Sequence, residues 1–184
     1  LGAFSEAELH DSSQAQQIGR RLFLNHCSTC HGITARGAFG FPNLTDDETQ
    51  WGDSFEAVKT TLRDGRNAVM TPWAAPLGGD VGVSEMAHYV RSLSGASHDA
   101  AAAANAAPKF QMFCTACHGA DAKGNPLFGA PNLTNDIWLY GGDAAQIEFT
   151  LRHGRMGVMP SFQSILDEHK RHILAAYVTG LRDR

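Results

Sequence analysis

The sequence lacks several features that define common protein classes. None of its stretches approaches the roughly 18 consecutive apolar residues that a membrane-spanning helix needs. It also lacks a secretory signal peptide and begins at Leu1, so we expect a mature or truncated soluble piece. Cysteine is scarce, with four in 184 residues. The 15 basic and 19 acidic side chains give a net charge of −4, which argues against nucleic-acid binding.

All four cysteines belong to two copies of one pattern, Cys-x-x-Cys-His, which is typical of c-type haem attachment. Two thiols on one helical turn add to the haem vinyl groups, and the next histidine supplies an axial nitrogen to the iron. The pattern predicts two covalent haem c groups, with thioethers from Cys27 and Cys30 and from Cys114 and Cys117, and with His31 and His118 as iron ligands.

Such cysteine pairs also occur in zinc ribbons and in thioredoxin-like redox proteins. A zinc ribbon places its pairs roughly 15–20 residues apart, and the gap here is far longer. A thioredoxin-like redox pair expects a βαβ context, and we find no strand pattern around either copy. The histidine that directly follows both pairs favours haem.

Internal repetition predicts the domain organisation. The run from Gly40 to Asp46 reappears from Gly129 to Asp136, in the same order and at nearly constant spacing relative to the haem motifs. We therefore expect domains at 1–97 and 98–184, each with one covalently bound haem. A haem would supply much of the buried apolar volume that a domain of about 90 residues lacks.

Hydrophobic spacing and capping residues predict an all-α fold, which we interpret as two tandem class I cytochrome c domains. Residues 1–11 are expected to be a loose lead-in, and Ala96–Ala107 either a linker or the first turns of a helix that Pro108 starts or kinks. The predicted helices cover 14–26, 53–64, 84–95, 143–152 and 166–181, with irregular loops between them.

The sixth iron ligand is predicted from the methionines. Met159 aligns with Met70 in the repeat, so we assign Met70 to the N-terminal haem and Met159 to the C-terminal haem. Met86 and Met112 are expected in the core. Closure of the sixth position by a thioether keeps substrates from the iron, which favours electron transfer over catalysis.

Four further residues are candidates for contacts with the haem propionates. Arg66 and Arg155 occupy matching Gly-Arg pairs and could bind carboxylates through forked hydrogen bonds, or simply lie solvated at the surface. Trp138 and Tyr140 could donate an indole N–H and a phenol O–H, or be ordinary core aromatics.

Several runs resemble the dihaem subunit, subunit III, of cbb3-type cytochrome c oxidases. They are Pro131 to Gly142, Arg21-Leu22-Phe23, Gly40 to Asp46, Ala87 to Gly95, and Leu1-Gly2-Ala3-Phe4, which is similar to the end of a membrane-proximal motif. The resemblance implies the same eight haem ligands as above. It departs at Thr49 to Asp53, where the family has Trp-Leu-Tyr-Gly-Gly, and at Met70 to Trp73, where it has Met-Pro-Ala-Trp.

The resemblance also implies partners and a location. The subunit would take electrons from a soluble donor cytochrome c and pass them to the monohaem subunit and the oxygen-reducing catalytic subunit. It would lie on the periplasmic side of the bacterial inner membrane, held by a membrane anchor absent from this chain. A free dihaem electron shuttle and a dihaem peroxidase are the alternatives.

Residues 1–97 hold 11 acidic and 7 basic side chains, against 8 and 8 in 98–184, so a basic donor is expected to dock on the N-terminal domain.

Overall fold

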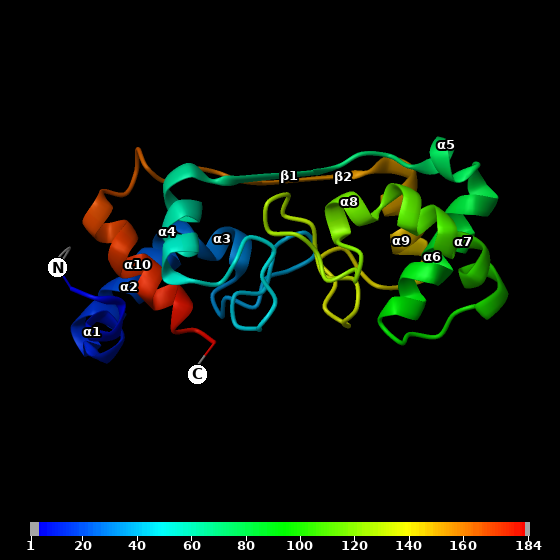
Figure 1. Ribbon diagram of the computed structural model, residues 1–184. Coiled ribbons are helices and arrows are strands. Elements are labelled where there is room, and N and C mark those ends of the chain that lie inside the picture. Colours follow the sequence, from blue (N-terminus) through cyan, green and yellow to red (C-terminus); the bar gives the residue numbers. More distant parts are fainter. Residues whose placement is uncertain (1–3, 183–184) are drawn as a thin grey trace. The chain divides into compact units, whose positions relative to one another are not determined.

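The computed structural model describes residues 4–182, which are mostly helical. The contacts divide the chain into two compact units. The first unit combines residues 1–66 with 158–184, and the second unit is the continuous segment 67–157. Figure 1 shows the course of the chain through both.

The first unit is built from helices that pack around one central helix. α2 (Ser13–His26) and α4 (Phe55–Asp64) both pack against α10 (Glu168–Thr179), and α1 (Glu6–Asp11) contacts α2 and α10. The short α3 (Ser28–His31) follows α2. Gly19 lies against Tyr177 so closely that any side chain on it would meet the tyrosine Cβ. The absence of a side chain at Gly19 thus allows α2 and α10 to approach.

The second unit has an equivalent set of helices. α6 (Asp80–Leu93) packs against α7 (Ala100–Phe113) and α9 (Ala144–His153), while α5 (Ala74–Leu77) contacts α6 and α8 (Thr115–His118) follows α7. Large side chains of α6 and α7 are fully buried at their contact, among them Val83, Met86 and Phe110. Each such side chain stabilises the fold by about 1.5–3 kcal/mol.

The two strands, β1 (Arg66–Met70) and β2 (Arg155–Met159), form a two-stranded sheet. The strands run antiparallel, because Gly65 lies against the carbonyl of Met159 and Gly154 against that of Met70. The all-α prediction missed this sheet. Each five-residue strand finds its hydrogen-bonding partner in the other repeat, which a local pattern does not reveal.

Most predicted helices are confirmed, with two corrections and one choice between alternatives decided. Residues 6–11 form a helix rather than a loose lead-in, because Ser5 and Glu8 make a capping box. α6 begins at Asp80, after the left-handed Gly78 and Gly79, instead of at Ser84. The alanine-rich segment forms the first turns of α7, which Asp99 caps and which continues through Pro108.

The compact units cut across the repeats. The segment 67–97 lies in the second unit although it belongs to the first sequence repeat, and 158–184 lies in the first unit although it belongs to the second. Counted by unit, the first has 12 acidic and 10 basic side chains and the second has 7 and 5, a balance of −2 in each. The charge difference on which N-terminal docking of a basic donor rested therefore disappears.

Within residues 4–182, none of the helices has the length and hydropathy that crossing a membrane requires. Residues 1–3, which supply most of the run similar to a membrane-proximal motif, lie outside the described residues.

Candidate functional site

Each Cys-x-x-Cys-His motif follows directly on the end of a helix. In the first unit the Cys27 amide donates to the Phe23 carbonyl at 2.8 Å and so closes α2, and the Cys27 carbonyl then accepts from the His31 amide at 2.9 Å. In the second unit Cys114 makes the same bonds to Phe110 and His118, both at 2.9 Å. Both motifs therefore place two sulfurs and an imidazole on one turn, as haem attachment requires.

The two histidines are buried and oriented in the same way. Nδ1 of His31 lies 3.0 Å from the Pro42 carbonyl oxygen, and Nδ1 of His118 lies 3.1 Å from that of Pro131. Because a carbonyl only accepts, Nδ1 must carry the proton in each ring, which leaves the Nε2 lone pair for a metal. Burial lowers the pKa of both imidazoles, although the bond to the carbonyl opposes this, so the rings are held neutral as iron ligands must be.

The repeated Pro-Asn-Leu-Thr segment explains how those carbonyls are held. Oδ1 of Asn43 accepts from the Thr45 amide at 2.9 Å and from the Thr45 hydroxyl at 2.8 Å. Asn132 and Thr134 make the same pair of bonds at 2.9 and 2.7 Å. The asparagine turn comes directly after the proline whose carbonyl meets the histidine, and so fixes the backbone there.

The cysteines do not have the properties of a reactive redox pair. Burial raises the pKa of the Cys27 thiol and of the Cys114 thiol to about 11 in each case. A thioredoxin-like nucleophile needs a lowered pKa, because the thiolate is the reactive form. Cys30 and Cys117 are exposed. Across the described part of the chain, no three His, Cys, Asp or Glu residues are grouped as a metal site.

The methionines are placed in a way that the repeat did not predict. Met70 packs against the hydrophobic cluster of the second unit, which Cys114 also contacts. Met159 packs against the cluster of the first unit, which includes Cys27. Both methionines are half-buried, at the ends of β1 and β2. Each methionine thus packs against the hydrophobic cluster that holds or contacts the first motif cysteine of the other repeat.

Two other methionine predictions can be compared with the structure. Met86 is fully buried, as expected. Met112 is 74% exposed, so its placement in the core was wrong. It directly precedes Phe113, the last residue of α7, whose buried residues are Ala103, Ala106 and Phe110.

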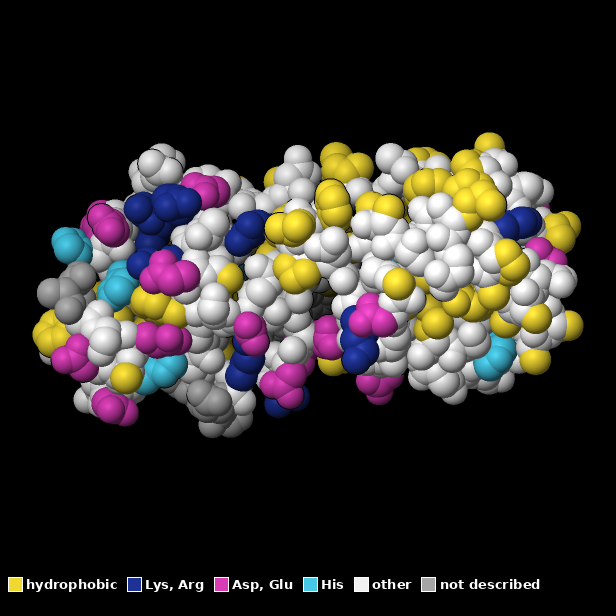
Figure 2. Space-filling model, in the orientation of Figure 1, with side chains coloured by type: hydrophobic (Ala, Val, Ile, Leu, Met, Phe, Trp, Pro, Cys, Tyr) yellow, Lys and Arg dark blue, Asp and Glu magenta, His cyan; other side chains and the backbone are white. Residues whose placement is uncertain are grey.

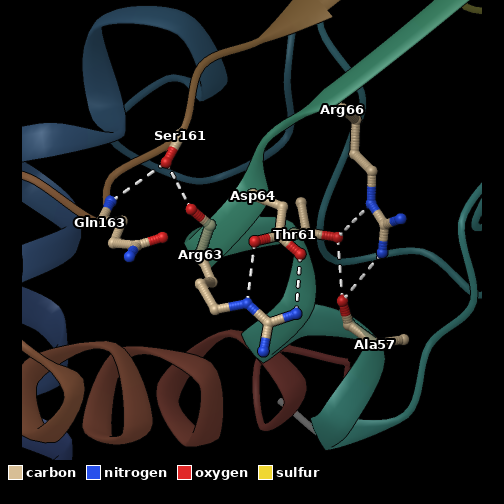
Figure 3. Close-up of polar contacts among 7 residues, drawn as sticks. All are labelled: Ala57, Thr61, Arg63, Asp64, Arg66, Ser161 and Gln163. Carbon is tan, nitrogen blue, oxygen red and sulfur yellow. Dashed lines mark hydrogen bonds and ion pairs between the residues drawn. The ribbon is translucent and has the colours of Figure 1, made fainter.

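Each candidate arginine is held on an aromatic ring. Nε of Arg66 donates to the Thr61 hydroxyl at 2.8 Å and Nη2 to the Ala57 carbonyl at 3.2 Å, as Figure 3 shows. Its guanidinium lies 4.9 Å from the centre of the Trp51 ring. Such stacking orients the planar guanidinium without using all of its hydrogen-bond donors.

Arg155 is held similarly in the second unit. Its Nε donates to the Thr150 hydroxyl at 2.9 Å, and its guanidinium lies 4.4 Å from the centre of the Tyr140 ring. The structure therefore brings together two of the predicted propionate contacts, Arg155 and Tyr140. Trp138 packs against the hydrophobic cluster of this unit, and its indole covers Gly142.

Comparison with known proteins identifies the family. The family model "Cytochrome C oxidase, cbb3-type, subunit III" matches residues 14–90 and again 101–178. The chain belongs to this family. The two matches confirm the tandem arrangement read from the sequence repeat, with one copy of the motif in each.

Curated proteins similar to this chain are also named as subunits of cbb3-type cytochrome c oxidases. The Cbb3-type cytochrome c oxidase subunit CcoP of Rubrivivax gelatinosus is 44% identical over 168 residues, which cover 91% of this chain and 55% of the relative. Subunit FixP of a Bradyrhizobium strain is 40% identical, covering 98% and 68%, and subunit CcoP of Cereibacter sphaeroides is 40% identical, covering 91% and 61%. The chain thus spans between 55% and 68% of these relatives.

Several residues of the site were not predicted from the sequence. Asn43 and Asn132 were seen only as part of a repeated run, although their side chains shape the loop behind each histidine. Trp51 was noted only as a departure from the family pattern. It occupies in the first repeat the position of Tyr140, and both rings stack on an arginine. That shared position was the signal that could have identified it.

Proposed function

We propose that the protein is the dihaem electron-transfer subunit of a cbb3-type cytochrome c oxidase. The observation that carries this proposal occurs in both units: a buried neutral imidazole, oriented by a proline carbonyl, on the same helical turn as two cysteines. These residues fit a covalent haem. Exposed apolar side chains near the motifs, such as Ile33, Phe39 and Leu127, also suit an apolar group that would cover them.

Each residue has a defined part in this proposal. Cysteine pairs 27/30 and 114/117 form the thioethers, His31 and His118 supply one axial nitrogen each, and Met70 and Met159 supply the sixth ligands. Haem c supplies one-electron chemistry between ferrous and ferric iron. The methionine thioethers favour the ferrous state and close the sixth position to substrates, so the chain transfers electrons and has no catalytic residue of its own.

The arginines and aromatic rings complete each site. Arg66 and Arg155 are each oriented by a threonine hydroxyl and a stacked ring, and a guanidinium suits the forked binding of a propionate carboxylate. Trp138 and Tyr140 lie in the loop that precedes α9 and would border the same carboxylates.

In this role the chain would lie on the periplasmic side of the membrane as part of the oxidase. Its partners would be a soluble donor cytochrome c, the monohaem subunit and the oxygen-reducing catalytic subunit.

Expression with the c-type haem maturation machinery tests the proposal. Mass spectrometry under denaturing conditions should show two covalent haems, and the double change of Cys114 and Cys117 to Ala should remove one. The reduced protein should transfer electrons to the isolated oxidase core, should not bind cyanide and should not turn over hydrogen peroxide. Turnover of peroxide, or absence of covalent haem, would contradict the proposal.

A further inference from the structure

Two glycines lie against the proline carbonyls that orient the histidines. In the first unit a Cβ on Gly37 would lie 2.7 Å from the Pro42 carbonyl oxygen, the atom that accepts from Nδ1 of His31. In the second unit a Cβ on Gly124 would lie 2.8 Å from the Pro131 carbonyl carbon. Neither position admits a side chain while the carbonyl stays where it is.

Each of these glycines also contacts the main chain of the histidine. The Gly37 amide donates to the His31 carbonyl at 2.9 Å, and the Gly124 amide donates to the His118 carbonyl at 2.8 Å. The glycines have φ values of +69° and +88°, in the region that favours glycine. One residue therefore links the backbone of each histidine to the carbonyl that its ring binds.

Backbone hydrogen bonds close the first loop on both sides of Pro42. Before the proline, Ala38 and Phe41 exchange amide-to-carbonyl bonds of 3.0 and 2.8 Å. After it, the Leu44 amide donates to the Ala35 carbonyl at 2.8 Å. The segment that holds the carbonyl is thus pulled onto the segment that holds the glycine, to a separation that a Cβ would not allow.

The second loop is closed by the same bonds over a longer turn. Asn125 and Ala130 exchange bonds of 3.0 and 3.2 Å, and the Leu133 amide donates to the Ala122 carbonyl at 2.8 Å. The turn between the exchanging residues is two residues long in the first unit and four in the second. The two loops therefore share the glycine contact and the closing bonds, and differ in the turn.

Burial within the protein chain contributes little to holding the tips of these loops. Phe39 in the first turn is 62% exposed, and Leu127 in the second is 85% exposed. Figure 2 shows hydrophobic side chains of this kind at the surface of one face of the molecule. Because the stabilisation from burial scales with the apolar area removed from water, the closing bonds and the glycine contact set the position of each carbonyl.

We propose that Gly37 and Gly124 are positioning residues for electron transfer: each lets its loop close, holds the proline carbonyl on the axial histidine, and so keeps the reduction potential of its haem low. This rests on the proposed haem function and deepens it. A carbonyl that accepts from Nδ1–H makes the imidazole a stronger donor at Nε2, which favours ferric over ferrous iron. A Cβ at either glycine would push the carbonyl back, weaken this bond and raise the potential.

Variants of the full chain that carry a single haem test the role. With Cys27 and Cys30 changed to Ala, Gly124→Ala should raise the midpoint potential of the remaining haem. The ferrous-to-ferric ratio at a fixed potential should rise by about three- to tenfold, or about 28–59 mV for a one-electron couple. With Cys114 and Cys117 changed to Ala, Gly37→Ala should do the same for the other haem.

A spectroscopic measurement separates this role from a purely structural one. NMR of the ferrous protein with nitrogen-15-labelled histidine should show faster exchange of the Nδ1 proton of the ligand histidine in each glycine variant. Gly95→Ala is the matched control in the second unit, because Gly95 also has a positive φ, +72°, but has nothing within 4 Å. It should change neither the midpoint nor the exchange of this proton.

The possible outcomes distinguish this role from the proposed function. An unchanged midpoint in either glycine variant, a raised midpoint without faster Nδ1 exchange, or an equal shift in Gly95→Ala would overturn the positioning role alone. Loss of haem attachment in either variant, with normal attachment in Gly95→Ala, would also overturn it, since that glycine would then serve assembly. Absence of covalent haem before any glycine is changed would overturn the proposed function, and this role with it.

Discussion

Gly154 lies against the carbonyl oxygen of Met70, and the space between them does not admit a β-carbon. Gly65 has the same relationship to Met159. The glycine of each Gly-Arg pair therefore does more than end a helix. It sets the backbone position of a candidate iron ligand, while the arginine beside it stacks on a ring.

Gly154→Ala should destabilise the protein more than a positive φ alone explains. With φ +72° and ψ −176°, Gly154 has a backbone conformation essentially restricted to glycine, which costs another residue on the order of 1–3 kcal/mol, and the clash with the Met70 carbonyl adds to this. Gly79→Ala is the matched control, because Gly79 has a similar φ of +81° and ψ of −154° but has nothing within 4 Å. Free energies of unfolding from denaturant titrations should show the larger loss for Gly154→Ala. Equal losses would refute the role of the contact.

Gly19→Ala should cost about 1–3 kcal/mol through overpacking against Tyr177. Alanine is otherwise preferred to glycine inside a helix by roughly 0.5–1 kcal/mol. On a Tyr177→Gly background, which removes the Cβ that the new side chain would meet, the same change should therefore cost less. A double-mutant cycle of unfolding free energies measures the difference, and a cost that persists unchanged without the Tyr177 side chain would contradict this account of the helix contact.

The haem-free protein should show unequal cysteine reactivity at pH 8. Burial raises the pKa of the Cys27 and Cys114 thiols to about 11, so these groups stay protonated well above neutral pH and are poor nucleophiles. Cys30 and Cys117 are exposed and should be alkylated first by iodoacetamide. Peptide mapping by mass spectrometry after brief labelling gives the order, and unfolding in urea should equalise the four rates. Uniform rates in the folded protein would exclude the burial described here.

The two haems should have different reduction potentials, because their surroundings differ. Arg66 stacks on Trp51, whereas Arg155 contacts both Tyr140 and Phe149. Hydrogen bonding and solvent exposure around a haem tune its potential. A redox titration of each single-haem variant, made by changing one cysteine pair to Ala, should give separate midpoints. A nearby positive charge favours ferrous over ferric iron, because the ferrous form carries one positive charge fewer. Replacing the arginine of a unit with Gln removes that charge and should therefore lower the midpoint potential of that unit's haem. Indistinguishable midpoints would count against the prediction.

Local patterns predicted the limits of several helices correctly. The Ser54 and Asp143 caps, and the glycines that end α4 and α9, fixed the helix limits within a residue or two. Those signals act over a single turn and need no distant partner. The roles of Asn43 and Thr61 were not predicted, although their hydrogen bonds are local, to Thr45 two residues away and to Arg66 five residues away.

By itself, the sequence determined the two attachment motifs, the repeat and the family, because each depends on residues that are near neighbours in the chain. Only the tertiary structure decided which halves of the repeats pack together. Phe23 and Phe110 occupy equivalent positions, and so do Tyr89 and Tyr177, so either tyrosine offers each phenylalanine the same kind of surface. Composition and spacing cannot distinguish two such pairings. The strands β1 and β2 carry the chain from one unit to the other, and the anchors on either side of them decide that Met70 packs with Cys114 and Met159 with Cys27.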